Sequence, residues 1–193
     1  MINFYAKGGK TMDNEIKTVA FDLGGVLAYQ DLSALSEEEL FLFKTYMNRN
    51  NIKDRELIEY ASKKIPDIYL KIHRLTGDAL PTLEMLKDMK VRPSVWTNNI
   101  KEIDAWFEEV GLYRYIKRED IINSFYIGAD KPELEFYQRA LKLLKSLPQK
   151  VLFLDDKDEN ILSAERCGIN GKLYNMDENL TETVESEIKR RGL

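Results

Sequence analysis

The chain has 193 residues, which suits one domain with room for a small inserted lobe. Hydrophobic residues make up 44% and charged residues 32% of the chain, as in an ordinary folded protein rather than a disordered one. The net charge of -4 leaves no basic field for nucleic acid or anionic lipid. Because Cys167 is the single cysteine, no internal disulfide can form.

The first residues carry no targeting signal of the secretory type. No charged start is followed by an apolar stretch, and no apolar run approaches the roughly 20 residues that span a bilayer. We therefore expect a cytoplasmic protein that does not enter a membrane. Residues 1–11 show no period and include Gly8 and Gly9, so we interpret them as a flexible extension.

Short apolar runs, each followed by polar residues, recur along the chain. The first covers Ile16 to Phe21 and ends at Asp22 and two glycines, as expected of a buried parallel strand that leads into a turn. Pro93 marks the first residue of the second run, because proline is disfavoured inside a central strand. Further strands are expected at 94–96, around 123–127, at 151–154 and at 171–174.

Helical patterns separate these runs. Apolar residues recur at helical spacing after Pro81, between Ile100 and Val110, and from Leu134 to Leu144. Pro132 suits the first position of the third of these helices. Two further helices are expected at 158–168 and 180–188. Strands that alternate with helices predict an α/β fold with a doubly wound parallel sheet.

One stretch interrupts the alternation. From about residue 31 to residue 78 the pattern is helical throughout, with no strand signal. We interpret residues 31–78 as a small all-helical cap, inserted into a core built from residues 12–30 and 79–193.

Several polar side chains follow the predicted strands. In an open parallel sheet, ligands bind beyond the carboxyl ends of the strands. Three carboxylates at one point repel one another unless a cation joins them, and oxygen ligands favour a hard ion such as Mg²⁺. Lysine and hydroxyl groups can hold phosphate oxygens. The pattern therefore indicates phosphoryl transfer at a site built from Asp22, Thr97, Asn98, Lys131, Asp155 and Asp156.

Four segments give this pattern a family resemblance. In chain order they are VAFDLGGVL, SVWTNN, GADKPELEFYQRAL and VLFLDDKDENILSAERCGI. Together they resemble the four ordered motifs of the haloacid dehalogenase superfamily, and the likeness extends from Lys17 to about Tyr174. The resemblance implies a doubly wound, Rossmann-like core and an aspartate nucleophile that forms an aspartyl-phosphate intermediate.

The resemblance also assigns roles to residues. Asp22 would be the nucleophile, and Thr97 with Lys131 would hold the phosphoryl oxygens. Magnesium would bind the Asp22 carboxylate and the Gly24 carbonyl. It would also bind the acidic pair, Asp156 directly and Asp155 in support or through water. Asn160 closes the spacing of the last motif and is expected to shape its loop.

The sequence departs from the family pattern at one catalytic position. Most phosphatases of this family carry a second Asp two residues after the nucleophile, and this chain has Gly24 there. General acid–base catalysis is worth roughly 10²–10⁴ in rate, so expulsion of a poor leaving group should be weakened. The expected substrate is therefore a small phosphorylated molecule with a good leaving group, such as a sugar phosphate. Alternatively an acid from the cap, with Asp31 as one candidate, replaces the missing group.

Other functions remain open at this point. A dehalogenase of the same fold would need no metal, against which Asp155 and Asp156 argue. A phosphate-binding module that has lost turnover is favoured by Gly24 and opposed by the intact nucleophile. A phosphotransferase is a further possibility. His73 has no partner at metal-ligand spacing, so a surface or packing role is expected for it.

Overall fold

Five parallel strands form the central sheet of the protein. The computed structural model describes residues 15–192, so the extension predicted at 1–11 lies outside the described residues. The strands are arranged in the order β5 (Ile121–Asn123), β4 (Arg92–Thr97), β1 (Thr18–Phe21), β6 (Val151–Asp155) and β7 (Asn170–Leu173). The chain builds outward from β1 first on one side and then on the other. The predicted doubly wound sheet is therefore confirmed.

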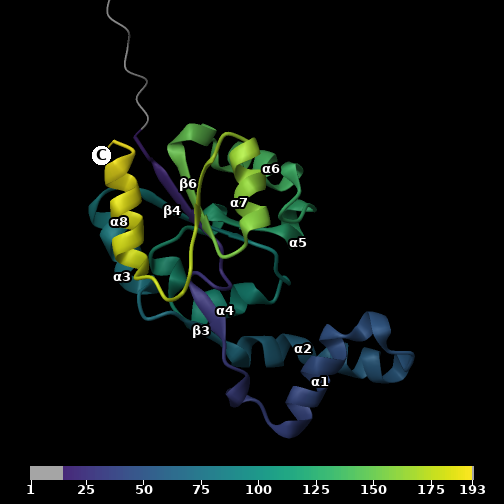
Figure 1. The fold of residues 1–193 in the computed structure, drawn as a ribbon. Coiled ribbons are helices and arrows are strands. Elements are labelled where there is room, and N and C mark those ends of the chain that lie inside the picture. The colour runs from purple at the N-terminus through teal and green to yellow at the C-terminus, as the bar shows by residue number, and fades with distance from the viewer. Residues whose placement is uncertain (1–14, 193) are drawn as a thin grey trace, which may run out of the picture.

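Helices cover both faces of the sheet, as Figure 1 shows. All four side chains of β1 are buried, and successive ones enter opposite cores because side chains alternate along a strand. Phe21 belongs to one core and Ala20 to the other. The first core includes residues of α3 (Ala79–Asp88), α4 (Ile103–Glu109) and α8 (Leu180–Arg190). The second includes residues of α6 (Leu134–Leu144) and α7 (Asp158–Arg166).

Two helices project from this core as an arm, which we define as residues 37–72 (Figure 1). They are α1 (Glu37–Met47) and α2 (Arg55–Ile72). Ser36 and Glu39 form a capping box at the start of α1, so this helix begins where its exposed amide groups are satisfied. The two helices share an apolar cluster of their own, made of Leu42, Phe43, Ala61, Ile65, Ile68 and Ile72.

A small antiparallel ribbon joins the arm to the core. Strand β2 (Ala28–Gln30) pairs with β3 (His73–Leu75), with Gln30 opposite His73. The expectation that residues 31–78 are wholly helical is therefore wrong at its end. Three residues are too few to show a strand period, and β3 exists only because β2 lies beside it.

Three other expectations shift by a few residues. The strand expected around 123–127 lies earlier, because the Asn123 side chain accepts from Phe125 N and starts the short helix α5 (Ser124–Ile127). Pro132 precedes α6 rather than opening it, since Asp130 and Glu133 close a turn around it. Pro93 is the second residue of β4. It is tolerated because β5 pairs with β4 only from Val95 onward.

The remaining elements are single 3₁₀ turns. They lie at Leu32–Ala34, Arg49–Asn51, Leu112–Arg114, Arg118–Asp120 and Pro148–Lys150. Within residues 15–192, no helix has the length and apolar character needed to cross a membrane.

Candidate active site

The polar residues that follow the strands meet at one edge of the sheet. Asp22 follows β1, Thr97 ends β4 and Asp155 ends β6, so the parallel topology brings them together although they are far apart in sequence. A cavity of about 370 Å³ opens at this edge. Its walls include six of the seven residues expected at the site: Asp22, Gly24, Thr97, Asn98, Lys131 and Asp156. The seventh, Asp155, is fully buried and does not line the cavity.

Lys131 links two of the carboxylates. Its Nζ lies 2.8 Å from Asp22 Oδ1 and 2.7 Å from Asp155 Oδ2, and its side chain is only 2% exposed. Asp155 also accepts Asn160 Nδ2 at 2.9 Å on each oxygen and Lys157 N at 2.9 Å. A buried ion pair is stable only when its remaining hydrogen-bonding capacity is satisfied, and Asp155 meets that condition. Asp155 therefore holds Lys131 and Asn160 in place.

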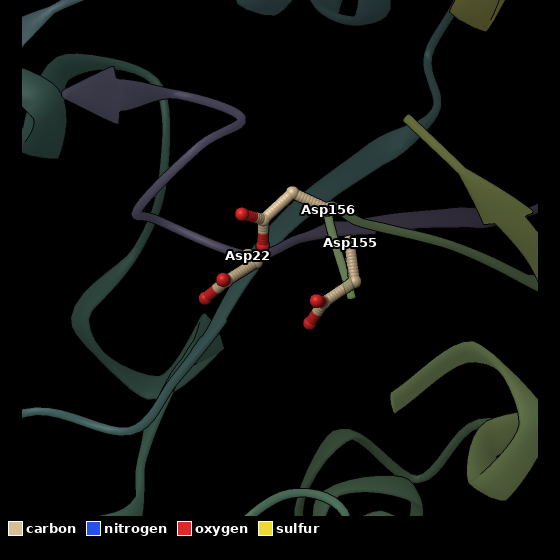
Figure 2. A group of neighbouring side chains, drawn as sticks. All are labelled: Asp22, Asp155 and Asp156. Atoms are coloured by element: carbon tan, nitrogen blue, oxygen red, sulfur yellow. The ribbon is translucent and has the colours of Figure 1, made fainter. Parts of the chain in front are cut away.

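Three acidic side chains converge beside the lysine. Ligand atoms of Asp22, Asp155 and Asp156 all lie within 4.8 Å of one another. Figure 2 shows that the adjacent Asp155 and Asp156 direct their side chains to different sides, with Asp156 on the side of Asp22. Such crowding leaves an excess of negative charge that one lysine does not neutralise. All the donors are oxygens, which is the chemistry that Mg²⁺ prefers.

The acidities of the cluster reflect burial first and the neighbouring negative charge second. Burial raises the pKa of Asp22 to about 6; the charge of Lys131 opposes the rise and that of Asp155 adds to it. Loss of hydration, and then the charge of Asp155, also raises the pKa of Asp156. Both shifts mean that the ionised forms are less stable here than in water. A bound cation would relieve that instability.

Gly25 leaves the space that Asp156 occupies. Its φ is +80°, and an ideal Cβ at this position would lie 2.5 Å from Asp156 Oδ2. Gly24, by contrast, would have no atom within 4 Å of a Cβ and does not adopt a positive φ. Backbone bonds from Gly25 N to Ala28 O and from Ala28 N to Leu23 O, both 2.8 Å, fix the turn. Position 25 is therefore constrained by sterics, and position 24 is not.

This contrast gives a matched pair of variants. Gly25→Ala is expected to reduce the free energy of unfolding by about 1–2 kcal/mol, because alanine is strained at positive φ, and to weaken Mg²⁺ binding by displacing Asp156. Gly24→Ala should change stability by less than about 0.5 kcal/mol. Urea unfolding and calorimetric Mg²⁺ titration measure both effects. Equal behaviour of the two variants would contradict the steric role of Gly25.

Asn98 serves Lys131 rather than facing the cavity with a free amide. Its Nδ2 donates to Lys131 O at 2.8 Å, and its Oδ1 accepts Lys131 N at 2.9 Å. The reciprocal pair ties the end of β4 to the turn before α6. Thr97 is 2% exposed, and within residues 15–192 its hydroxyl accepts only a long bond of 3.4 Å from Asn99 Nδ2. The Thr97 hydroxyl therefore retains its own proton for a ligand.

The arm and the ribbon supply walls that the sequence analysis missed. Tyr29, Gln30, Tyr69 and His73 line the cavity opposite the strand ends. No motif signalled them. Tyr29, Gln30 and His73 lie in a ribbon of three-residue strands, and the helical pattern around Tyr69 does not show which part of the helix meets the strand ends. His73 is 4% exposed, which agrees with packing but not with a surface role.

Asp31, named as a candidate acid, does not line the cavity. Its carboxylate accepts the Ser33 hydroxyl at 2.5 Å and Ser33 N at 3.1 Å. The bond from the Ser33 hydroxyl is the main cause that lowers the pKa of Asp31. A carboxyl group with a lowered pKa is a poor proton donor near neutral pH, so neither its location nor its acidity supports that role.

A match to a protein-family model points to the same family that the four motifs resemble. The model described as haloacid dehalogenase-like hydrolase matches residues 36–168. A HAD family enzyme from Bacteroides thetaiotaomicron, in complex with magnesium and inorganic phosphate, has a similar fold with a TM-score of 0.68 at 20% identity. That match covers 87% of this chain and 98% of the other.

Two relatives of known activity are phosphatases. A sesquiterpene phosphatase, astK, from Aspergillus oryzae is 26% identical over 181 residues, which cover 83% of this chain and 90% of the relative. A glyceraldehyde 3-phosphate phosphatase from Methanothermobacter thermautotrophicus is 27% identical over 113 residues, which cover 58% of this chain and 49% of the relative.

Proposed function

The chain belongs to the haloacid dehalogenase-like hydrolases, and from that premise we propose that it is a Mg²⁺-dependent phosphohydrolase acting on a small phosphomonoester. One observation carries the proposal. The Asp22 carboxylate lies in a cavity with a buried lysine 2.8 Å away and two further carboxylates within 4.8 Å. That set combines a nucleophile, a phosphate-binding cation and an oxygen-only metal site.

Asp22 is held in the orientation that an attacking group needs. Its Oδ1 accepts Leu23 N at 2.7 Å and Lys131 Nζ at 2.8 Å. No group in the described part of the chain bonds to its Oδ2. In the proposed reaction Asp22 attacks phosphorus through this second oxygen, and an aspartyl-phosphate forms. Lys131 and the Thr97 hydroxyl bind the phosphoryl oxygens, and water then releases phosphate.

The acidic cluster suits a resident magnesium ion. Asp22, Asp156 and the Gly24 carbonyl would hold it, and Asp155 would support the site from behind. When bound, the ion would neutralise charge on the carboxylates and on the phosphoryl group. The raised pKa values of Asp22 and Asp156 support this assignment, because burial destabilises the two ionised carboxylates and a bound cation would offset that cost.

The arm is proposed to act as a cap that contacts the leaving group. Under this division residues 31–78 form the cap, and residues 12–30 with 79–193 form the core. Tyr69 and His73, at the base of the arm, line the same cavity as Asp22. The names of both relatives describe phosphate esters of small organic molecules, which agrees with a cavity of about 370 Å³. A sugar phosphate is one such substrate.

Hydrolysis of an aryl phosphate tests the function directly. With Mg²⁺ the protein should release nitrophenol and phosphate from 4-nitrophenyl phosphate, and excess chelator should reduce the rate at least 100-fold. Adding Mg²⁺ back in excess should restore it. The rate is expected to depend on Mg²⁺ because crowded carboxylates and a phosphate dianion repel one another without a cation.

Two outcomes would contradict the proposal. Halide release from a 2-haloacid that is indifferent to chelator would identify a dehalogenase. Binding of inorganic phosphate without turnover of any ester would identify a binding module.

A further inference from the structure

The proposed reaction leaves one proton without a donor. When the ester bond to phosphorus breaks, the leaving oxygen carries negative charge, and position 24 offers only a glycine. The groups in the cavity wall that could give a proton are Tyr29, Tyr69, His73 and the lysines Lys131 and Lys157. Lys131 is already bound between two carboxylates, and Lys157 is exposed rather than enclosed in the cavity.

Resting on the proposed function, we infer that the Tyr69 hydroxyl is the proton donor to the leaving-group oxygen. Tyr69 lies on α2, near the end where the arm joins the core, and lines the cavity together with Asp22. Its ring packs against both the core of the sheet and the cluster of the arm. The ring is therefore held at the junction between the two parts.

The backbone of Tyr69 is fixed while its hydroxyl is available. The Tyr69 carbonyl accepts His73 Nδ1 at 2.5 Å, and the two rings lie 4.4 Å apart. Among residues 15–192, no protein group forms a hydrogen bond with the Tyr69 hydroxyl, although the residue as a whole is half-buried. A partly buried hydroxyl normally finds a partner, so an unpaired one on a residue that lines a cavity points to a ligand.

Tyr69 lines the same cavity as Asp22, and its surroundings keep the hydroxyl protonated. Burial raises the pKa of Tyr69, and the charges of Tyr46 and Asp22 raise it further. The Asp22 effect means that the two groups are within electrostatic reach of each other. Tyr69 consequently stays protonated throughout the physiological pH range. A phenol is still much more acidic than the aliphatic alcohol that leaves, so transfer to an alkoxide is downhill.

His73 is less suited to the same task. A carbonyl can only accept, so the bond to Tyr69 O places the ring proton on Nδ1. Burial is the main cause that lowers the pKa of His73, which keeps the ring neutral near pH 7. A neutral ring with its proton on Nδ1 has no proton on Nε2 to give. Tyr29 also lines the cavity, but it is 42% exposed, so its ring is held less firmly than that of the half-buried Tyr69.

The proton that Tyr69 gives up in the first step is returned to it in the second. In the first step the Asp22 oxygen bonds to phosphorus, the bond to the leaving oxygen breaks, and that oxygen takes the Tyr69 proton. In the second step water attacks phosphorus, the bond to Asp22 breaks, and the water proton returns to the Tyr69 phenolate. The net reaction consumes one ester and one water, and yields one alcohol and one phosphate.

The test compares leaving groups in Tyr69→Phe. With a simple alkyl phosphate kcat should fall about 100-fold or more, the range expected for loss of a general acid. With 4-nitrophenyl phosphate, whose leaving group needs no proton, kcat should change less than about 3-fold. Across a series of esters, the dependence of log(kcat/KM) on the leaving-group pKa should become steeper.

A matched control lies on the same helix. Tyr60→Phe makes the same chemical change at a side chain that is 47% exposed and lines a separate groove of the arm, so every rate should be unchanged. Equal losses of Tyr69→Phe with both kinds of ester, or no loss with either, would overturn the inference. Nitrophenyl phosphate turnover by the unaltered protein tests the proposed function independently, because that ester does not require the acid.

Discussion

Replacing Asp22 by asparagine is expected to abolish ester hydrolysis, with a loss of at least 1,000-fold in kcat for 4-nitrophenyl phosphate. The amide has nearly the shape of the carboxylate but cannot form the proposed acyl-phosphate bond. Its carbonyl oxygen can still accept the Leu23 amide and Lys131 Nζ, which are 2.7 and 2.8 Å from Oδ1 in the native site. Rates of nitrophenol release measure the effect, and acid quenching should trap phosphorylated protein only when Asp22 is present.

The same variant is expected to be more stable than the native protein in metal-free buffer. Burial raises the pKa of Asp22 to about 6, well above its usual value of about 3.8, so ionisation opposes folding at pH 7.5. At 1.36 kcal/mol per pKa unit, removing that charge should add about 1–3 kcal/mol to the free energy of unfolding. The raised pKa favours the fold fully below pH 3.8, and that benefit is lost as the pH rises through 6. The gain from asparagine should therefore be present above pH 6 and vanish near pH 4.

Asp88→Asn provides the control, because Asp88 is an exposed carboxylate at the end of α3. It should alter neither the turnover nor the free energy of unfolding at pH 7.5 by a measurable amount. Residual turnover by Asp22→Asn within 10-fold of the native rate would identify a different nucleophile. A loss of stability at pH 7.5 would show instead that the carboxylate is needed to compensate Lys131.

The sequence predicts the main parts of the site because sheet topology converts chain order into position. Apolar runs that end at Asp22, Thr97 and Asp155 become adjacent parallel strands, and their carboxyl ends must then share one edge. The same logic places Lys131, which lies just before a helix between two strands. These conclusions need only strand order and the direction of the chain.

The parts that were missed depend on contacts between short or distant segments. Strand β3 has three residues and is defined by its partner β2, so no period in residues 73–75 could predict it. The pair of hydrogen bonds between Asn98 and Lys131 joins positions 33 residues apart. The cavity wall formed by Tyr69 depends on how the arm leaves the core. Propensity and spacing carry no information about such pairings.

Replacing Lys131 by methionine is expected to damage both stability and phosphate binding. Asp155 is fully buried and Asp22 is 8% exposed, so removal of the lysine leaves two carboxylates without their shared cation. Breaking a buried ion pair by deleting one partner typically costs about 3–5 kcal/mol of unfolding free energy. Urea unfolding in metal-free buffer at pH 7.5 should show a loss of this size. Lys64→Met, at an exposed position on α2, should show almost none.

Unfolding measured with and without Mg²⁺ should show whether Lys131→Met loses stability through electrostatic repulsion or through poor packing. Without Lys131 the cluster of Asp22, Asp155 and Asp156 has a larger uncompensated charge, so the folded variant should bind Mg²⁺ more tightly than the native protein does. A ligand that binds only the folded state raises stability by an amount that grows with its affinity. Mg²⁺ should therefore stabilise Lys131→Met more than it stabilises the native chain, while hydrolysis stays at least 100-fold impaired. Equal stabilisation of both proteins by Mg²⁺ would mean that Lys131 and the cation do not compensate the same carboxylates. That result would contradict the proposed metal site.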